Sequence, residues 1–181
     1  MEVSTPGRAV LLFCAAFLML MIVIPLVYPY GSFVHLDGKA GVIDNWGKLM
    51  FADPLTRAVY FLGDLFCHEE MSRSFIINGS QMAFCQRDVS VLSGVILGLI
   101  VTDKAVFHLY VGKKPFLILA SIMIITLAVE WGIESVFGVN LVAGRVATGI
   151  LAGAGIALLL QYAVTKEYEE IMFGKEFDKG V

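Results

Sequence analysis

The sequence is poor in charged residues, because only 16% of its 181 residues are Asp, Glu, Lys or Arg, where a soluble domain has about a quarter. Its net charge is −3 and it has no basic stripe, which excludes a surface built to neutralise the phosphates of nucleic acid. It also lacks a phosphate-binding loop, a Gly-x-Ser-x-Gly elbow, a His-Glu-x-x-His pair, a dinucleotide fingerprint and a Cys-x-x-Cys-His haem attachment. The enzyme classes that these motifs mark are therefore not indicated.

Cysteine is also scarce, with Cys14, Cys67 and Cys85 as its three positions. Cys14 lies in an apolar run and is expected to pack there. Cys67 and Cys85 share one polar segment, so they form the one plausible pair within the chain.

Apolar residues are abundant, at 58% of the chain, and they are concentrated in long blocks. Four blocks are long enough to cross about 30 Å of hydrocarbon as helices. The sequence therefore predicts an all-α integral membrane protein that forms one domain, residues 1–181, with spans at about 9–29, 88–110, 115–136 and 141–164. The expected location is the cell membrane, with the lipid bilayer as a partner and several passes through it.

The first block is expected to be a retained span. After Arg8 it contains about 20 residues without charge, whereas a secretory signal has an apolar region of roughly 7–15 residues followed by small residues. Here Pro25 and Tyr28 follow, which is typical of an aromatic membrane interface.

Between the first two spans lies a polar loop, residues 31–87. Asp53-Pro54 is a good helix start, and Leu55, Val59, Leu62 and Phe66 recur after it at helical spacing. This pattern predicts a short amphipathic helix that lies at the membrane interface or plugs the mouth of the bundle. Asn78-Gly79 predicts a turn.

Orientation is predicted from basic residues in the short connections. Arg8, the connection between the second and third spans, and the carboxyl-terminal tail are basic, whereas the 137–140 connection has no Lys or Arg. Both termini are therefore expected to be cytoplasmic, with the polar loop outside.

Glycine pairs at spacing four occur in two spans, Gly94 with Gly98 and Gly149 with Gly153. Such pairs let helix backbones approach closely in lipid, so these faces could also join copies of the chain into a homo-oligomer.

Three charged residues fall near the ends of the last two spans: Glu130, Glu134 and Arg145. The glutamates are four residues apart and share one helix face. Because a charge inside a membrane is costly unless it is paired or hydrated, we expect Arg145 to pair with one glutamate. This pair could serve only to lock the helices, or it could belong to a functional site.

The densest polar cluster is Cys67, His68, Cys85 and Asp88, which offers two thiols, an imidazole and a carboxylate, all of them acceptable zinc ligands. A Cys67–Cys85 disulfide is an alternative, and closing a loop of about 18 residues would stabilise the fold by about 3 kcal/mol. A redox-active dithiol is a third possibility, with His68 or Arg87 lowering a thiol pKa.

These motifs together resemble a family of uncharacterised prokaryotic membrane proteins known as domain of unknown function 2085. The similarity covers residues of about 60–164 and rests on Cys67-His68, Arg73-Ser74-Phe75, Cys85-x-Arg87-Asp88, Glu130-Trp131-Gly132-Ile133-Glu134, Asn140, Arg145 and Thr148-Gly149. Asp88 stands where many members have a cysteine, which keeps a metal ligand and removes a Cys-x-x-Cys redox motif. The resemblance implies a membrane protein with these polar residues at its site, and it implies no particular reaction.

The expected function is an extracytoplasmic zinc site formed by the Cys/His/Asp cluster, with hydrolysis of a lipid-borne or envelope substrate as the reaction class. Glu130 or Glu134 would act as a base or contact the metal ligands from outside, and Arg145 and Arg87 would orient an anionic group. Arg73 and Asn140 complete the polar site. The alternatives are a disulfide-stapled transporter or assembly subunit without catalysis, and a membrane thiol oxidoreductase.

Overall fold

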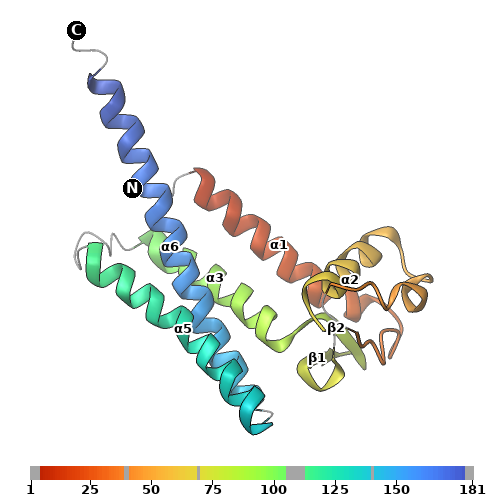
Figure 1. The fold of residues 1–181 in the computed structure, drawn as a ribbon. Helices are drawn as coiled ribbons and strands as arrows, with labels where there is room; N and C mark the ends of the chain where they lie inside the picture. Colours follow the sequence, from red (N-terminus) through yellow and green to blue (C-terminus); the bar gives the residue numbers. More distant parts are fainter. Residues whose placement is uncertain (1–4, 39–40, 69, 105–112, 140, 178–181) are drawn as a thin grey trace.

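The computed structural model describes residues 5–38, 41–68, 70–104, 113–139 and 141–177. Most of these residues form long helices (Figure 1), namely α1 (Thr5–Val27), α3 (Gln86–Lys104), α5 (Lys113–Phe137) and α6 (Val142–Phe177). Between α1 and α3 the chain builds a smaller unit at one end of these helices. It contains α2 (Pro54–Phe66), two short 3-10 helices (Trp46–Leu49 and Met71–Arg73) and the strands β1 (Ser74–Ile77) and β2 (Ser80–Cys85). We call this part, residues 28–85, the α2–β unit.

Among the described residues, three helices are long and apolar enough to cross a membrane: Gly7–Val27, Lys114–Phe137 and Val142–Val164. Each lies within a few residues of an expected span. Helix α3 is not among the three, because it has Arg87 and Asp88 in its first turn and Asp103 and Lys104 at its end. The expected end of that span, residues 105–110, lies outside the described residues. The structure is therefore that of a mostly helical membrane protein with three candidate spans.

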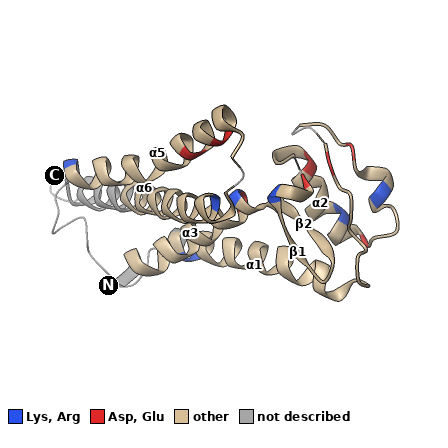
Figure 2. Cartoon of the chain, turned by 90° about the horizontal axis from the view of Figure 1, so that it is seen from below, with Lys and Arg blue, Asp and Glu red and all other residues tan. Residues whose placement is uncertain are grey.

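Charged residues avoid the long helices except near their ends. Figure 2 shows them gathered on the α2–β unit and at helix ends, and the long central stretches of α1 and α5 have none. This separation is the one that a bilayer requires, since a charge in hydrocarbon is costly.

The prediction of a purely helical protein is wrong in one place, because β1 and β2 pair as an antiparallel hairpin. Asn78 and Gly79 form its turn, which confirms the predicted turn, and both have positive φ angles of 50° and 67°. That geometry is a type I′ turn, whose twist matches the twist of the flanking strands. Phe75, Ile76 and Ile77 favour a strand, but they lie in a segment whose overall polarity suggested a loop.

The predicted helix start at Asp53 is confirmed, since its carboxylate accepts hydrogen bonds from the backbone N–H groups of Leu55 (2.9 Å) and Thr56 (3.1 Å). The predicted apolar stripe of α2 is only partly buried within the chain. Val59 is buried, but Leu55 is 55% and Phe66 72% exposed. The buried face of α2 instead contains Thr56, Val59, Tyr60, Gly63 and Asp64.

The segment expected as a loop is packed around a core of its own, which includes Phe33, Leu49, Tyr60 and Met82. Two buried polar side chains of this unit are paired with each other, as the Asn45 side-chain amide donates to Asp64 Oδ1 at 2.7 Å. These contacts hold the end of β2, and with it the start of α3, in one position.

Helix α3 packs on α6 through glycines. A Cβ atom on Gly94 would clash with the carbonyl of Ile150, and one on Gly153 would clash with the carbonyl of Val91. Gly98 and Gly149 lie equally close to the opposite helix. Both glycine pairs are thus used within one chain, and a homo-oligomer through other faces stays a prediction.

Candidate functional site

A network of four charged side chains joins α3, α5 and α6. Arg87 Nη2 lies 2.8 Å from Glu130 Oε2 and 2.8 Å from Glu134 Oε2. Arg145 Nε lies 2.6 Å from Glu134 Oε1, which confirms the expected pairing of Arg145 with one glutamate. The two positive and two negative charges balance, as burial in a membrane requires.

The positions of these residues in their helices explain the network. Glu130 and Glu134 lie one turn apart near the end of α5, Arg87 lies in the first turn of α3, and Arg145 lies near the start of α6. The side chains are largely enclosed, with exposed fractions of 2% for Arg145 and 6% for Glu134. The Arg145–Glu134 contact is an ion pair whose alignment does not make a hydrogen bond.

Gln86 extends this network to the hairpin. Its side-chain oxygen accepts from Arg145 Nη1 at 3.4 Å, and its amide nitrogen donates to the Ser74 carbonyl at 3.2 Å. Gln86 is buried, and only its position between Cys85 and Arg87 could have indicated this role beforehand.

The second cluster contains Cys67, Cys85 and Asp88, which come from three different elements. Cys67 ends α2, where its N–H donates to the Gly63 carbonyl at 2.7 Å, Cys85 ends β2, and Asp88 lies in the first turn of α3. One potential metal-binding atom from each residue lies within 4.8 Å of the other two. The structure thus brings together three of the four residues that the sequence suggested as zinc ligands, because the fold of the α2–β unit places Cys67 and Cys85 beside the start of α3.

No disulfide joins Cys67 to Cys85, and Cys85 donates a hydrogen bond from its Sγ to Asp88 Oδ2 at 3.0 Å. The pKa of Cys85 is raised well above its usual range by its hydrogen bond with Cys67, by burial and by the negative charge of Asp88. Without a metal, Cys85 is therefore a neutral thiol at physiological pH. A bound cation would reverse this preference, because metal ligation requires the thiolate.

The other expected site residues lie elsewhere. His68 is exposed, and its Nδ1 lies 3.4 Å from the Gly38 carbonyl, so the structure does not bring it into the thiol–carboxylate cluster. Arg73 forms a partly exposed ion pair with Glu70 at 3.1 Å. Asn140 lies outside the described residues.

The two clusters meet at the start of α3 but face different sides of it. Arg87 reaches α5, whereas Asp88 lines a hollow of about 280 Å³ together with Phe17 and Met21 of α1. Phe66 and Phe84 also line this hollow, so the carboxylate lies beside a largely apolar surface.

Comparison with known proteins identifies one family. The family model described as "Predicted membrane protein (DUF2085)" matches residues 67–159, which is about half of the chain. The matched stretch begins at Cys67 and contains both clusters. No curated protein and no solved structure matches.

Proposed function

The chain belongs to DUF2085, a family of predicted membrane proteins, and from this premise we propose that it crosses the cell membrane four times, with α3 as the additional span. The 19 residues of α3 extend over about 28 Å, close to the thickness of the hydrocarbon layer. Its start lies beside the end of α5, and farther along it Leu99 packs with Cys14 of α1. The positive charge of Arg87 in its first turn is compensated by Glu130 and Glu134.

In this arrangement the α2–β unit, the end of α5 and the start of α6 lie on the outer side of the membrane, and both termini lie in the cytoplasm. Arg8, Lys113 and Lys114 then lie on the cytoplasmic side, as the positive-inside tendency requires. The exposed Leu55 and Phe66 of α2 would lie at the outer membrane surface.

We propose that Cys67, Cys85 and Asp88 bind zinc on that outer side. The proposal rests on one observation, the convergence of two sulfur atoms and one carboxylate oxygen within 4.8 Å. Zinc accepts this ligand set, and sites with three protein ligands keep a fourth position for water or substrate. His68 follows Cys67 in the chain and could fill that position only after its ring leaves the Gly38 carbonyl.

An open fourth position favours hydrolysis over a purely structural role, because zinc makes its bound water a nucleophile near neutral pH. The apolar hollow beside Asp88 favours a lipid-borne substrate, with an acyl or isoprenoid chain against Phe66 and Phe84. The reaction would add water across an ester or phosphoester bond, so that one product carries the new hydroxyl and the other the proton.

The roles of Glu130, Glu134 and Arg145 follow from their contacts. Both carboxylates bind guanidinium groups on the side of α3 that faces away from the thiols. In our proposal they hold α3 in place, with Arg87 as the link, instead of accepting a proton from water.

Metal analysis of the full-length chain tests the zinc site. Protein purified in detergent without chelators should contain about one zinc per chain. Cys85→Ser and Cys67→Ser should lose it, whereas Cys14→Ser, the matched change at the cysteine in α1, should keep it. Metal-free wild-type protein with a Cys67–Cys85 bond would rule the site out.

Hydrolysis has its own test. Fluorogenic lipid esters and phosphodiesters in bilayer nanodiscs should be cleaved by the zinc-loaded chain and not after Cys85→Ser. A zinc-loaded wild-type chain without activity on either class would leave the metal a structural role only.

One observation favours a second candidate, a disulfide-forming dithiol. Cys67 and Cys85 lie within the same 4.8 Å limit and share a hydrogen bond, so a small movement would allow oxidation. Non-reducing mass spectrometry separates the candidates, because a sulfur atom in a disulfide is not available as a thiolate ligand.

A further inference from the structure

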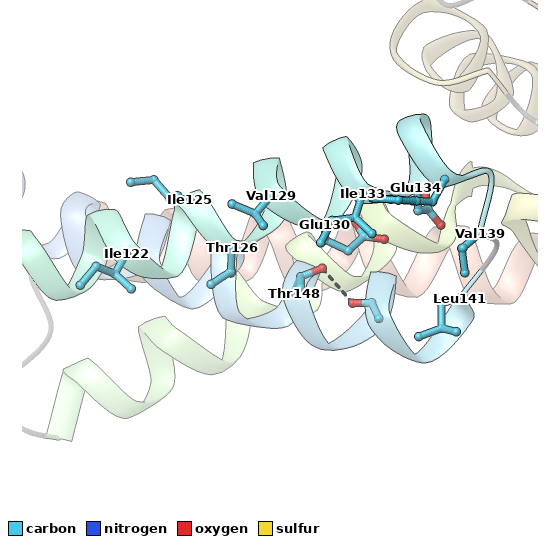
Figure 3. A pocket seen from close by; sticks show the side chains of 12 residues that line it. Ile122, Ile125, Thr126, Val129, Glu130, Ile133, Glu134, Val139, Leu141 and Thr148 are labelled. Carbon is cyan, nitrogen blue, oxygen red and sulfur yellow. Dashed lines mark hydrogen bonds between the residues drawn. The ribbon is translucent and has the colours of Figure 1, made fainter.

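A groove of about 640 Å³ runs between α5 and α6 on the side of α5 that faces lipid (Figure 3). Ile122, Ile125, Val129 and Ile133 form much of its wall, and each is at least half exposed. Apolar side chains along a membrane helix are expected to contact lipid chains. The groove is unusual because Glu130 and Glu134 also line it.

The polar side chains that line this groove can all accept hydrogen bonds. The hydroxyl groups of Thr126 and Thr148 donate to their own helices, at 2.6 Å to the Met123 carbonyl and 2.8 Å to the Gly144 carbonyl. Because each hydroxyl has already donated its hydrogen atom, its oxygen can take part in a further hydrogen bond only as an acceptor. Both oxygens of Glu134 face guanidinium groups.

Glu130 has acceptor capacity to spare. Its Oε2 receives two hydrogen bonds from Arg87, but its buried Oε1 has no hydrogen-bond partner among the residues that the structure describes. A buried acceptor without a partner is costly, so it favours a ligand that supplies a donor. Rotation about the last torsion of Glu130, which is soft, would present Oε1 to the groove.

The charge of the network sets the charge of that ligand. Arg87 and Arg145 already balance Glu130 and Glu134, so a cationic ligand would add an uncompensated charge inside the membrane. An anionic ligand would find acceptors where it needs donors. A neutral donor such as a hydroxyl group satisfies both conditions.

We propose that this groove binds a neutral lipid alcohol, a long apolar chain whose hydroxyl group donates a hydrogen bond to the Glu130 carboxylate. Glu130 lies seven residues before the end of α5 at Phe137, about 10 Å along the helix, so the hydroxyl lies near the outer membrane boundary. The chain then extends past Ile125 and Ile122 toward the middle of the bilayer. The site is separate from the thiol cluster and does not depend on zinc.

Photolabelling of the full-length chain in phosphatidylcholine nanodiscs tests this site. One probe is hexadecanol with a diazirine in its chain, and the matched probe is its methyl ether, which has the same chain and no donor. We expect the alcohol to label groove residues of α5 and α6 about tenfold more strongly than the ether, the value of one hydrogen bond to a charged acceptor.

A pair of glycine variants locates the effect. A Cβ on Gly144 would lie 3.9 Å from Glu130 Cγ and 3.5 Å from Leu141 Cδ2, so Gly144→Leu should fit in the helix and fill the groove. Gly132 on α5 has nothing within 4 Å of its Cβ position and does not line the groove, which makes Gly132→Leu the matched control. Only Gly144→Leu should remove the labelling by the alcohol.

Three results would overturn the proposal. Equal labelling by alcohol and ether would show that any lipid chain fills the groove. Stronger competition by hexadecylamine than by hexadecanol would show a cationic ligand. Crosslinks in the groove to a peptide of a second chain would show that another copy occupies it. The comparison of probes uses the wild-type chain, so it holds even if a variant fails to fold.

Discussion

Arg87 and Asp88 are neighbours in the first turn of α3, yet they serve two different clusters. Arg87 lies 2.8 Å from carboxylate oxygens of both Glu130 and Glu134, whereas Asp88 accepts a hydrogen bond from Cys85 at 3.0 Å. The first turn of α3 thus connects the helices of the membrane part with the thiols of the α2–β unit. A shift of this turn would disturb both clusters together.

Removing the guanidinium group of Arg87 should destabilise the protein strongly. In Arg87→Ala, Glu130 loses both hydrogen bonds to its Oε2 and Glu134 loses one, leaving enclosed carboxylates without enough positive charge. We expect a loss of about 3–5 kcal/mol in the free energy of unfolding, measured by denaturant titration in detergent micelles. Arg73→Ala, at a partly exposed ion pair, should cost about 1 kcal/mol or less. Similar losses in the two variants would contradict a structural role for the network.

A larger side chain at Gly153 should separate α3 from α6. Gly153→Leu places new atoms against the Val91 carbonyl and Gly94, where no space exists. Overpacking of this kind costs about 1–3 kcal/mol, and more against backbone, so the melting temperature in detergent should fall by several degrees. Gly132→Leu, at an open position, should leave the melting temperature unchanged. Equal decreases in the two variants would argue against close packing of Gly153 on α3.

Acid should weaken the junction between α1 and α2. The pKa of Asp53 is lowered by hydrogen bonds from the Thr56 hydroxyl, the Tyr28 hydroxyl and backbone N–H groups. A carboxyl group with a lowered pKa stabilises the fold above its unfolded pKa of about 4 and loses this contribution as the pH falls below that value. Between pH 6 and pH 2, the free energy of unfolding should depend less on pH in Asp53→Asn than in the wild-type chain. Asp37→Asn, at an exposed ion pair, is the control. An equal effect in both variants would show that Asp53 is not the source of the pH dependence.

In the metal-free protein, Cys85 should react slowly with alkylating reagents. Only the thiolate reacts, and the raised pKa of Cys85 keeps its fraction small at pH 8.5. Iodoacetamide labelling, followed by mass spectrometry, should be at least about tenfold slower than for an unstructured cysteine peptide. Asp88→Asn should accelerate it by removing a negative charge, and unchanged labelling would show that Asp88 does not act on the thiol.

The parts of the fold that follow from local sequence were predictable. The uncharged runs within α1, α5 and α6 predicted the three candidate spans within a few residues, because length and apolarity alone decide which segments can span a bilayer. Asp53-Pro54 gave the start of α2 because a helix start depends only on nearby residues. Asn78-Gly79 gave the turn for the same reason.

The parts that depend on packing were not predictable. The stripe containing Leu55 and Phe66 did not reveal that Tyr60 packs against the hairpin, where its hydroxyl donates a 2.7 Å hydrogen bond to the Gln81 carbonyl. The contact of Arg87 with both glutamates depends on how closely α3 and α5 approach α6. His68 is next to Cys67 in the chain but points away from the thiol cluster, and only the end of α2 determines this direction.

X-ray absorption at the zinc edge of the full-length, zinc-loaded chain is the sharpest test of zinc binding by Cys67, Cys85 and Asp88, because it reports the atoms that touch the metal. We expect two sulfur ligands at about 2.3 Å together with oxygen or nitrogen ligands at about 2.0–2.2 Å. A spectrum without sulfur ligands would contradict a zinc site at Cys67, Cys85 and Asp88.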